Sequence, residues 1–166
     1  MAVANITYAT ATTITMDLSA LASSTGYVAG VESNQIDNTT NKYIDAIVQG
    51  SFTVGTTPTI NNTFNVYLWG SHTTGGIDVL DGTGSAETFT TTSLANTVYL
   101  ASVNPILVNT SDTTYQVKAF SVAQFFGGIL PQYWGLYCSH NMVAALRTNA
   151  SNTDSFKYTG ITYTIT

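Results

Sequence analysis

Residues 44–54 read IDAIVQGSFTV, a run in which small or apolar side chains recur at every second position. Such alternation predicts a β-strand with one face turned toward a core. The residues on that face are Ile44, Ala46, Val48, Gly50, Phe52 and Val54. The next residues, 55–62, read GTTPTINN and include a proline, so they predict a turn.

The strand predicted after this turn, FNVYLW at residues 64–69, is apolar on both faces. Phe64, Val66 and Leu68 line one face, and Tyr67 and Trp69 line the other. A strand of this kind is expected to lie between a core and a second surface. We therefore interpret Tyr67 and Trp69 as candidate contacts with another subunit or with a larger assembly.

Further strands are predicted where apolar side chains alternate elsewhere in the chain. Their ranges are 6–16, 27–31, 97–108, 115–119, 133–140 and 156–165, with residues 142–146 continuing or pairing with the strand before them. Two short helical turns are predicted, at 17–22 and at 121–126, each after a capping residue. The phase of the apolar residues flips at Gly160, which predicts a β-bulge there.

About eight strands separated by turn signals predict an all-β fold. We expect a single-domain antiparallel β-sandwich of the jelly-roll type that spans residues 1–166 and carries one or two short helical turns. The strands nearest the two ends of the chain are expected to pair side by side. Neither an internal repeat nor a heptad pattern is visible in the sequence.

The composition is poor in charge and rich in short polar side chains. Only 8% of residues are charged, whereas the chain contains 30 threonines, 14 serines and 13 asparagines. The net charge is −5, and the only basic residues are Lys42, Lys118, Arg147 and Lys157. Four scattered cations do not form the basic stripe that a phosphate backbone requires, so we exclude nucleic acid as a partner. No apolar run approaches the length of about 20 residues that spans a membrane, and we see no signal peptide.

The long loop predicted at residues 70–93 is rich in Gly, Thr and Asp, and loops of this length are usually functional or mobile. We name three of its residues, His72, Asp78 and Asp81, as further candidate contacts with a subunit or a larger assembly. Asp78, Asp81 and Glu87 are similar to the acidic residues of a calcium loop, but the EF-hand spacing is not met. We therefore expect a solvated loop and no metal site.

Two other groups of residues have side chains that could carry chemistry. A Cys-Ser-His-Asn segment begins at Cys138, and in a strand Cys138 and His140 point the same way, onto an apolar face. We expect a buried, inert thiol there and no catalytic residue. Glu32, Asp37 and Asp45 could form a paired-carboxylate site. We favour the interpretation that they fix loop geometry through Asx-type turns.

Short motifs are spread over most of the chain. They are GVES at 30–33, IDNT at 36–39, NKYID at 41–45, GTTPT at 55–59, VY at 66–67, FGGILP at 126–131, WGL at 134–136 and YTGI-x-Y at 158–163. Together they resemble a family of small structural proteins of tailed bacteriophages. The resemblance implies association with the virion, and it brings no catalytic signature and no cofactor.

The resemblance and the composition lead to one main hypothesis. We expect a decoration or cement protein, not an enzyme, that is made in the host cytoplasm and binds the outer capsid surface of the virion. Its partners would be the major capsid protein and its own copies in a homotrimer, whose repeated weak contacts gain avidity. The alternative is a carbohydrate- or receptor-binding head of a tail fibre or spike, because jelly rolls host both roles. A glycan hydrolase ranks last, since the titratable residues are few.

Overall fold

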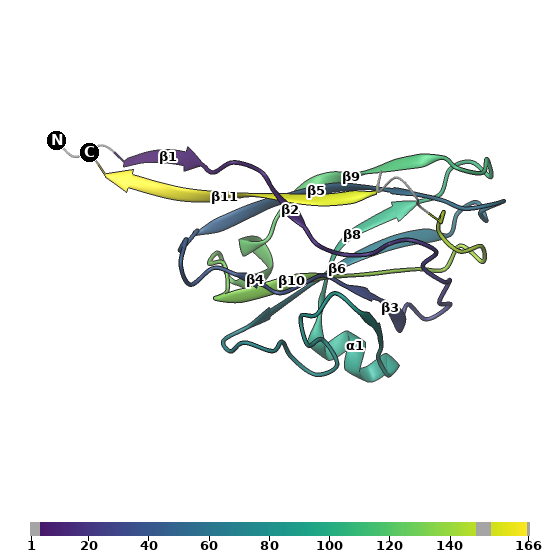
Figure 1. The fold of residues 1–166 in the computed structure, drawn as a ribbon, viewed down its shortest axis with the longest axis horizontal. Helices are drawn as coiled ribbons and strands as arrows, with labels where there is room; N and C mark the ends of the chain where they lie inside the picture. The colour runs from purple at the N-terminus through teal and green to yellow at the C-terminus, as the bar shows by residue number, and fades with distance from the viewer. Residues whose placement is uncertain (1–3, 149–153, 166) are drawn as a thin grey trace.

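The computed structural model describes residues 4–148 and 154–165, which form two antiparallel β-sheets packed face to face (Figure 1). In chain order the elements are β1 (Ala4–Tyr8), β2 (Thr12–Ile14), β3 (Ala29–Glu32), β4 (Ile36–Asp37), β5 (Asp45–Thr53), β6 (Thr63–Ser71), β7 (Ala86–Thr88), α1 (Thr91–Thr97), β8 (Tyr99–Pro105), β9 (Thr114–Ser121), the 3-10 helix η1 (Ala123–Phe126), β10 (Tyr133–His140) and β11 (Ser155–Ile165). None of the described helices is long and apolar enough to cross a membrane.

The sheets have jelly-roll topology, as the sequence predicted. The five-stranded sheet has the order β1-β11-β5-β9, with β2 also paired to β11. The six-stranded sheet has the order β7-β3-β10-β6-β8, with β4 also paired to β10. From β2 onward the main strands alternate between the two sheets, except that β6 and β8 are neighbours in the six-stranded sheet. As a result β10 and β11, late in the chain, lie beside β3 and β2. Two sheets joined by such long-range, Greek-key connections form a jelly roll.

The main core fills the space between the two sheets. Within β5, Ala46, Val48 and Phe52 are fully buried, which confirms the alternation predicted for that strand. Phe52 stacks on Phe64 of the opposite sheet, with ring centroids 4.0 Å apart. A side chain at Gly50 would collide with the Phe156 ring, so the aromatic ring takes the place of a core residue there.

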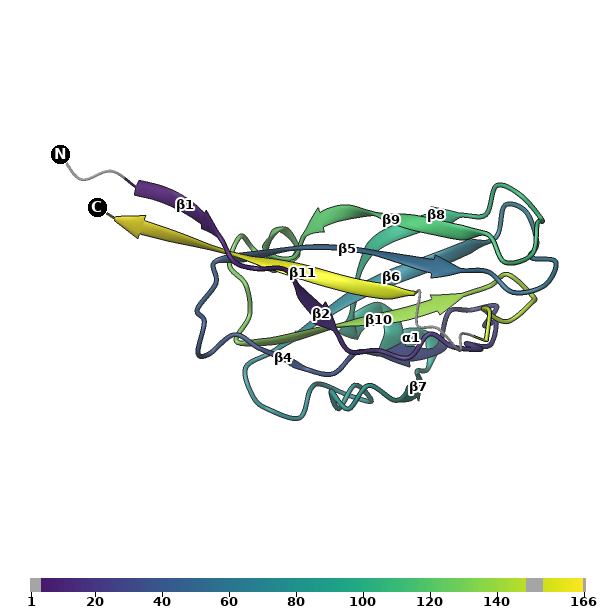
Figure 2. The ribbon, with the colours of Figure 1, turned by 45° about the horizontal axis from the view of Figure 1, so that its top comes forward.

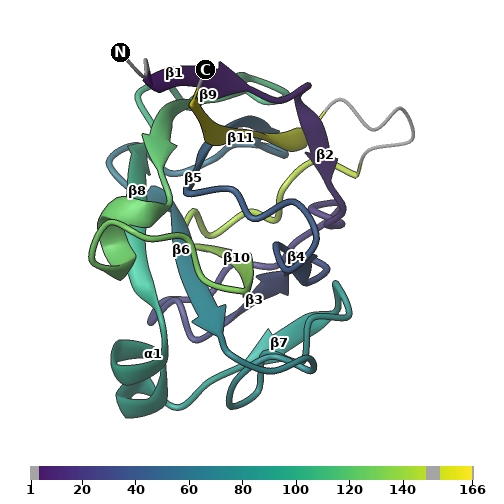
Figure 3. The same ribbon diagram turned by 90° about the vertical axis from the view of Figure 1, so that its left-hand side faces the viewer.

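A second, smaller core lies on the other face of the six-stranded sheet. Residues 77–98, which include β7 and α1 and which we call the cover segment, lie on this face (Figure 3). The buried members of this second core are Tyr67, Trp69, Leu80, Phe89, Leu94 and Tyr137. The six-stranded sheet is therefore covered on both faces, which explains why β6 is apolar on both.

Several sequence predictions were wrong in detail. Residues 6–16 form two short strands instead of one. No helix follows Asp17, although its Oδ1 accepts a hydrogen bond from the Ser19 N–H at 2.8 Å. Residues 142–146 contribute only an isolated bridge between Leu146 and Val54. The predicted loop at 70–93 contains β7 and the start of α1, whereas the helical turn near 121–126 is confirmed as η1.

Candidate functional site

The most unusual feature of the structure is a two-stranded ribbon that projects from one end of the sandwich (Figures 1 and 2). β5 begins at Asp45, which pairs with Ile161, so the last residues of β11 pair only with β1 among the described strands. The register runs from Tyr8 opposite Ile161 to Ala4 opposite Ile165. Both described ends of the chain therefore lie at the tip of this ribbon.

The two faces of the ribbon differ sharply in polarity. Directly opposed residues of antiparallel strands place their side chains on the same face. One face, which we call the apolar ribbon face, carries Ala4, Ile6, Tyr8, Ile161, Tyr163 and Ile165. On the other face Thr7 and Thr164 share a hydrogen bond, with 3.1 Å between their hydroxyl oxygens. Ile6, Tyr8, Tyr163 and Ile165 are 56–76% exposed.

The apolar ribbon face continues the outer face of the five-stranded sheet. In β11 the even-numbered Phe156 and Tyr158 pack into the core, and a side chain at Gly160 would meet the Tyr43 ring. The odd-numbered residues, including Ile161 and Tyr163, therefore point away from the sandwich. At Thr159 and before, outward positions of β11 are polar, so the apolar surface begins where the ribbon leaves the sandwich.

The bulge predicted at Gly160 is absent, so the flip in apolar phase at this residue needs another explanation. β11 pairs with β5 without interruption from Ser155 to Ile161. Register shifts in the described strands occur instead between Val48 and Gly50 and between Val66 and Tyr67. Because the strand keeps its register, the flip in apolar phase transfers the apolar side chains from the inner face to the outer face.

Tyr67 and Trp69 do not form an exposed contact surface, and that prediction is corrected. Trp69 is fully buried and Tyr67 is 8% exposed. Both lie in the second core, where the chain's own cover segment packs over them. The second surface expected opposite the core is therefore supplied by residues 77–98 of the same chain.

The other three candidate contacts have different surroundings. His72 is exposed and lines a groove of about 570 Å³ at the ribbon end of the sandwich. The groove also contains the aromatic residues Tyr99, Phe125 and Phe126. Asp78 is exposed and accepts hydrogen bonds from the hydroxyls of two residues of α1, Ser93 and Thr97. Asp81 belongs to an acidic cluster.

This acidic cluster consists of Glu32, Asp81 and Glu87, each of which offers a carboxylate oxygen within 4.8 Å of the others. β3 supplies Glu32 and β7 supplies Glu87. The two residues come close because β3 and β7 pair at the edge of the sheet, with Gly30 opposite Glu87. Glu32 is fully buried, Glu87 is half-buried and Asp81 is exposed, so the cluster opens to solvent through Asp81.

The carboxyl of Glu32 is in an unfavourable environment. Its Oε1 accepts a hydrogen bond from the Thr83 N–H at 3.0 Å, whereas its buried Oε2 has no hydrogen-bond partner. Burial is the main cause that raises the pKa of Glu32 to about 7, and contact with Asp81 adds to the rise. The hydroxyl of Thr83 holds the pKa of Asp81 below its usual value. Among the described residues the only ion pair joins Arg147 and Asp112, so no basic side chain neutralises the cluster.

The Cys-Ser-His-Asn segment does not supply a nucleophile and a base. Cys138 is fully buried in the main core, and burial raises the pKa of its thiol. His140 is also fully buried; its Nε2 lies 2.8 Å from the carbonyl oxygen of Leu21, and its Nδ1 accepts a hydrogen bond from the Met142 N–H at 3.3 Å. Asn141 Oδ1 accepts a hydrogen bond from the Thr63 N–H at 2.8 Å. The expected burial of the thiol is confirmed.

Asp37 and Asp45 fix loops, as the sequence indicated. Asp37 Oδ1 accepts hydrogen bonds from the N–H and the hydroxyl of Thr39 at 2.7 and 2.6 Å, which lowers the pKa of Asp37. Asp45 accepts hydrogen bonds from the Ser121 hydroxyl at 2.7 Å and from the Ala123 N–H at 2.9 Å. Asp45 thereby holds the start of η1 against β5. Glu32 is not paired with either carboxylate.

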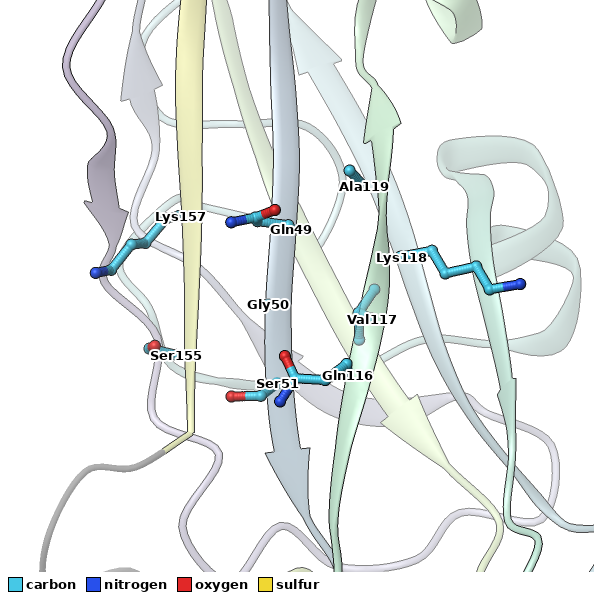
Figure 4. A pocket seen from close by; sticks show the side chains of 9 residues that line it. All are labelled: Gln49, Gly50, Ser51, Gln116, Val117, Lys118, Ala119, Ser155 and Lys157. Carbon is cyan, nitrogen blue, oxygen red and sulfur yellow. The ribbon is translucent and has the colours of Figure 1, made fainter.

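A shallow trough crosses the outer face of the five-stranded sheet (Figure 4). Lys157 and Lys118 extend from β11 and β9 at its two sides, and Gln49 and Gln116 lie between them. No aromatic or acidic side chain is among the residues that line it. The trough is therefore a polar, weakly basic surface without a ring on which a sugar could stack.

Comparison with known protein families, with curated proteins and with solved structures found no match for this chain.

Proposed function

We propose that this protein is a virion structural protein that decorates the outer surface of an icosahedral phage capsid as a homotrimer, bound to the major capsid protein. The apolar ribbon face is the contact between copies. The single observation that carries the proposal is this exposed, uncharged face on a projecting ribbon.

The ribbon needs a partner because two strands alone are marginally stable in water. Ile6, Tyr163 and Ile165 are all more than half exposed, and their side chains lie together on one face of the paired strands. Contiguous exposed apolar surface of this kind typically marks a site of protein association.

A second copy of this chain fits the apolar ribbon face. Neither β1 nor the paired end of β11 contains a charged residue, so identical faces meet without repulsion. The ribbon extends beyond the sandwich, so ribbons can meet while the sandwiches stay apart (Figure 2). A closed ring of three copies would bury the faces around one axis, and it would match the threefold positions between capsomers.

Cross-linking tests the contact directly. The only native cysteine, Cys138, is buried, so a cysteine introduced on the ribbon is the only reactive thiol. We expect Tyr163→Cys to form disulfide-linked pairs of chains under mild oxidation, because equivalent residues approach each other near the axis. The neighbouring Thr164→Cys, on the polar face, is the matched control and should cross-link far less. Equal cross-linking by both variants would argue against the assigned face.

Light scattering of the purified protein tests the assembly. We expect three chains for the native protein and for the control Thr7→Ser/Thr162→Ser, an opposed pair on the polar face. The variant Ile6→Thr/Tyr163→Thr should be a monomer, since threonine keeps the tendency to form strands but removes the apolar surface. A native protein that is a stable monomer would overturn the proposal.

Capsid binding requires an experiment with particles. Particles stripped of the protein should regain heat resistance when the native protein is added, and the Ile6→Thr/Tyr163→Thr variant should restore much less, because it loses avidity. Binding of the protein to tail tips instead of shells would refute decoration.

The groove beside His72 favours a second candidate function, a carbohydrate- or receptor-binding head. Tyr99 is 50% exposed there and meets Phe126 edge to face at 5.2 Å, so it offers a ring beside polar side chains. If the groove binds a glycan, Tyr99→Ala should abolish binding to host surface polysaccharide. Tyr8→Ala, which removes an exposed tyrosine of the ribbon, should leave that binding unchanged.

A further inference from the structure

We propose that Glu32, Asp81 and Glu87 bind a calcium ion that ties the cover segment to the edge of the six-stranded sheet. This site does not depend on the assembly proposed above. It joins residues that are about 50 positions apart in the chain and that meet only because β7 pairs with β3.

The first argument is the geometry of the ligands. Three carboxylate oxygens lie within 4.8 Å of one another, which allows a single ion to contact all three. Calcium binds oxygen ligands in flexible geometry, at about 2.3–2.6 Å and with six to eight oxygens, some of them from water. Asp81 is exposed, so the remaining positions are open to water.

The second argument is independent of the number of acidic residues. Glu32 is fully buried, its Oε2 has no hydrogen-bond partner, and its carboxyl lies against that of Asp81. A buried polar atom without a partner is costly, and such atoms in folded proteins usually have a bound ion or a water. The side chain nearest to it, Asp81, is itself a carboxylate, and a cation would give both groups a partner of opposite charge.

The chemistry of the cluster selects the type of cation. No histidine or cysteine belongs to it, so the soft or borderline ligands that zinc and copper prefer are missing. Magnesium demands near-ideal octahedral geometry and gives up its water reluctantly, whereas calcium tolerates irregular carboxylate sites. The hydroxyls of Thr83 and Ser85 already hydrogen bond to Asp81 and Glu87, at 2.6 and 2.7 Å, and hold these carboxylates in place.

Titration calorimetry of the full chain with calcium chloride, after treatment with a chelator, tests the site. We expect one ion per chain, and thermal unfolding should shift upward with calcium but not with the same concentration of magnesium. Absence of binding at millimolar calcium, or an equal response to magnesium, would overturn the proposal.

Matched variants locate the ion. Asp81→Asn and Glu87→Gln should each weaken calcium binding at least tenfold. Asp78→Asn is the control, because it removes a carboxylate from the same loop that points instead to α1, and its calcium affinity should stay within twofold of the native value. Loss of binding in the control equal to that in Asp81→Asn would contradict the assignment.

The variant Glu32→Gln tests whether Glu32 is a ligand of the cation or only a buried carboxyl that binds no ion. In chelator this variant should unfold at a higher temperature than the native protein, since it removes the unpartnered carboxyl and its repulsion from Asp81. It should no longer respond to calcium. A calcium-induced shift that survives in Glu32→Gln would refute the role of Glu32 as a ligand.

Discussion

Cys138 lies in the middle of β10 with its thiol in the main core, where Val31 and Val66 flank it on the neighbouring strands. We expect Cys138→Ala to leave oligomeric state unchanged and to lower the free energy of unfolding by about 1–3 kcal/mol, as small core truncations do. Urea titration measures the loss. A thiol reagent should label native Cys138 no faster than the chain unfolds; rapid labelling under native conditions would contradict the burial.

His140 makes stability depend on pH. Burial lowers its pKa below the usual 6.5, although the Leu21 carbonyl acts in the opposite direction. As pH falls, the unfolded chain takes up the proton first, so this stabilisation is present above 6.5 and is lost below it. We expect the stability advantage of the native protein over His140→Gln to shrink as the pH is lowered from about 8 to about 5.

The comparison with the variant is needed because Glu32 has the opposite effect. Its pKa rises from 4.5 to about 7 on folding, so its contribution to stability is present at low pH and is lost as the pH rises through 7. Urea unfolding of both proteins at each pH cancels this common term. A difference between native protein and His140→Gln that is constant over the range would contradict the assignment to His140.

At the level of single residues, the alternation of apolar side chains predicted the face of the sheet to which each side chain points. It did not predict which segment of the chain packs over that face. The period-two pattern correctly placed Cys138 and His140 on a buried face and Tyr67 and Trp69 on the face opposite the main core. It did not reveal what lies over that second face, because a strand pattern carries no information about which distant segment packs on it. The cover segment lies beyond β6 in the chain, in a stretch that reads as a loop.

Among the elements, α1 has the weakest sequence signal. Its seven residues, TTSLANT, include three threonines and a single large apolar residue, Leu94. Threonine is a poor helix former. The helix exists because Thr90 caps its first turn, accepting a hydrogen bond from the Ser93 N–H at 3.1 Å, and because Leu94 packs in the second core. Tertiary contacts therefore decide an element that local propensity does not predict.

Removing the anchor of α1 should loosen the cover segment. We expect Leu94→Ala to cost about 2–4 kcal/mol, in the range for buried leucines, and to make Trp69 accessible to acrylamide. Both tryptophans are fully buried, so fluorescence of the native protein should be quenched little. The exposed Thr92→Ala on the same helix is the control and should behave like the native protein. Unchanged quenching in Leu94→Ala would show that α1 does not shield Trp69 from solvent.

In the two terminal strands, one sequence pattern is compatible with two different structures. The pairing of the chain ends was predicted and is confirmed by β1 and β11. The flip at Gly160 was detected, but a bulge and a change of environment produce the same flip in the sequence. Only the register, which stays continuous from Thr159 to Ile161, separates the two explanations.

For the whole molecule, the jelly roll was predicted from strand number and turn spacing, whereas the acidic cluster was not. Asp81 and Glu87 were noticed as a loop motif and Glu32 as part of another segment, and the sequence gives no sign that they meet. Their contact depends on the antiparallel pairing of β3 with β7, which brings Gly30 opposite Glu87. Such edge pairings depend on the completed sheet and leave no local signature.

The charge of the whole molecule predicts that it does not bind DNA. The net charge is −5, and two of the four basic residues, Lys118 and Lys157, flank one trough where no other cation lies. We expect no gel shift of duplex DNA at micromolar protein even at low salt, where electrostatic affinity is greatest. A shift under these conditions, abolished by Lys118→Gln and Lys157→Gln, would assign nucleic-acid binding to that trough.

The ribbon also determines how the molecule responds to force. Ala4 and Ile165 lie opposite each other at its tip, so a pull on the two ends loads the ladder from one end. Hydrogen bonds between antiparallel strands run perpendicular to the chain, and in this geometry they break one after another instead of together. The ribbon should therefore unzip under a small tension as far as Tyr8 and Ile161, where β5 joins the sheet. A neighbouring molecule bound to the ribbon would raise that tension. Under load the ribbon therefore opens first, before the sandwich behind it is disrupted.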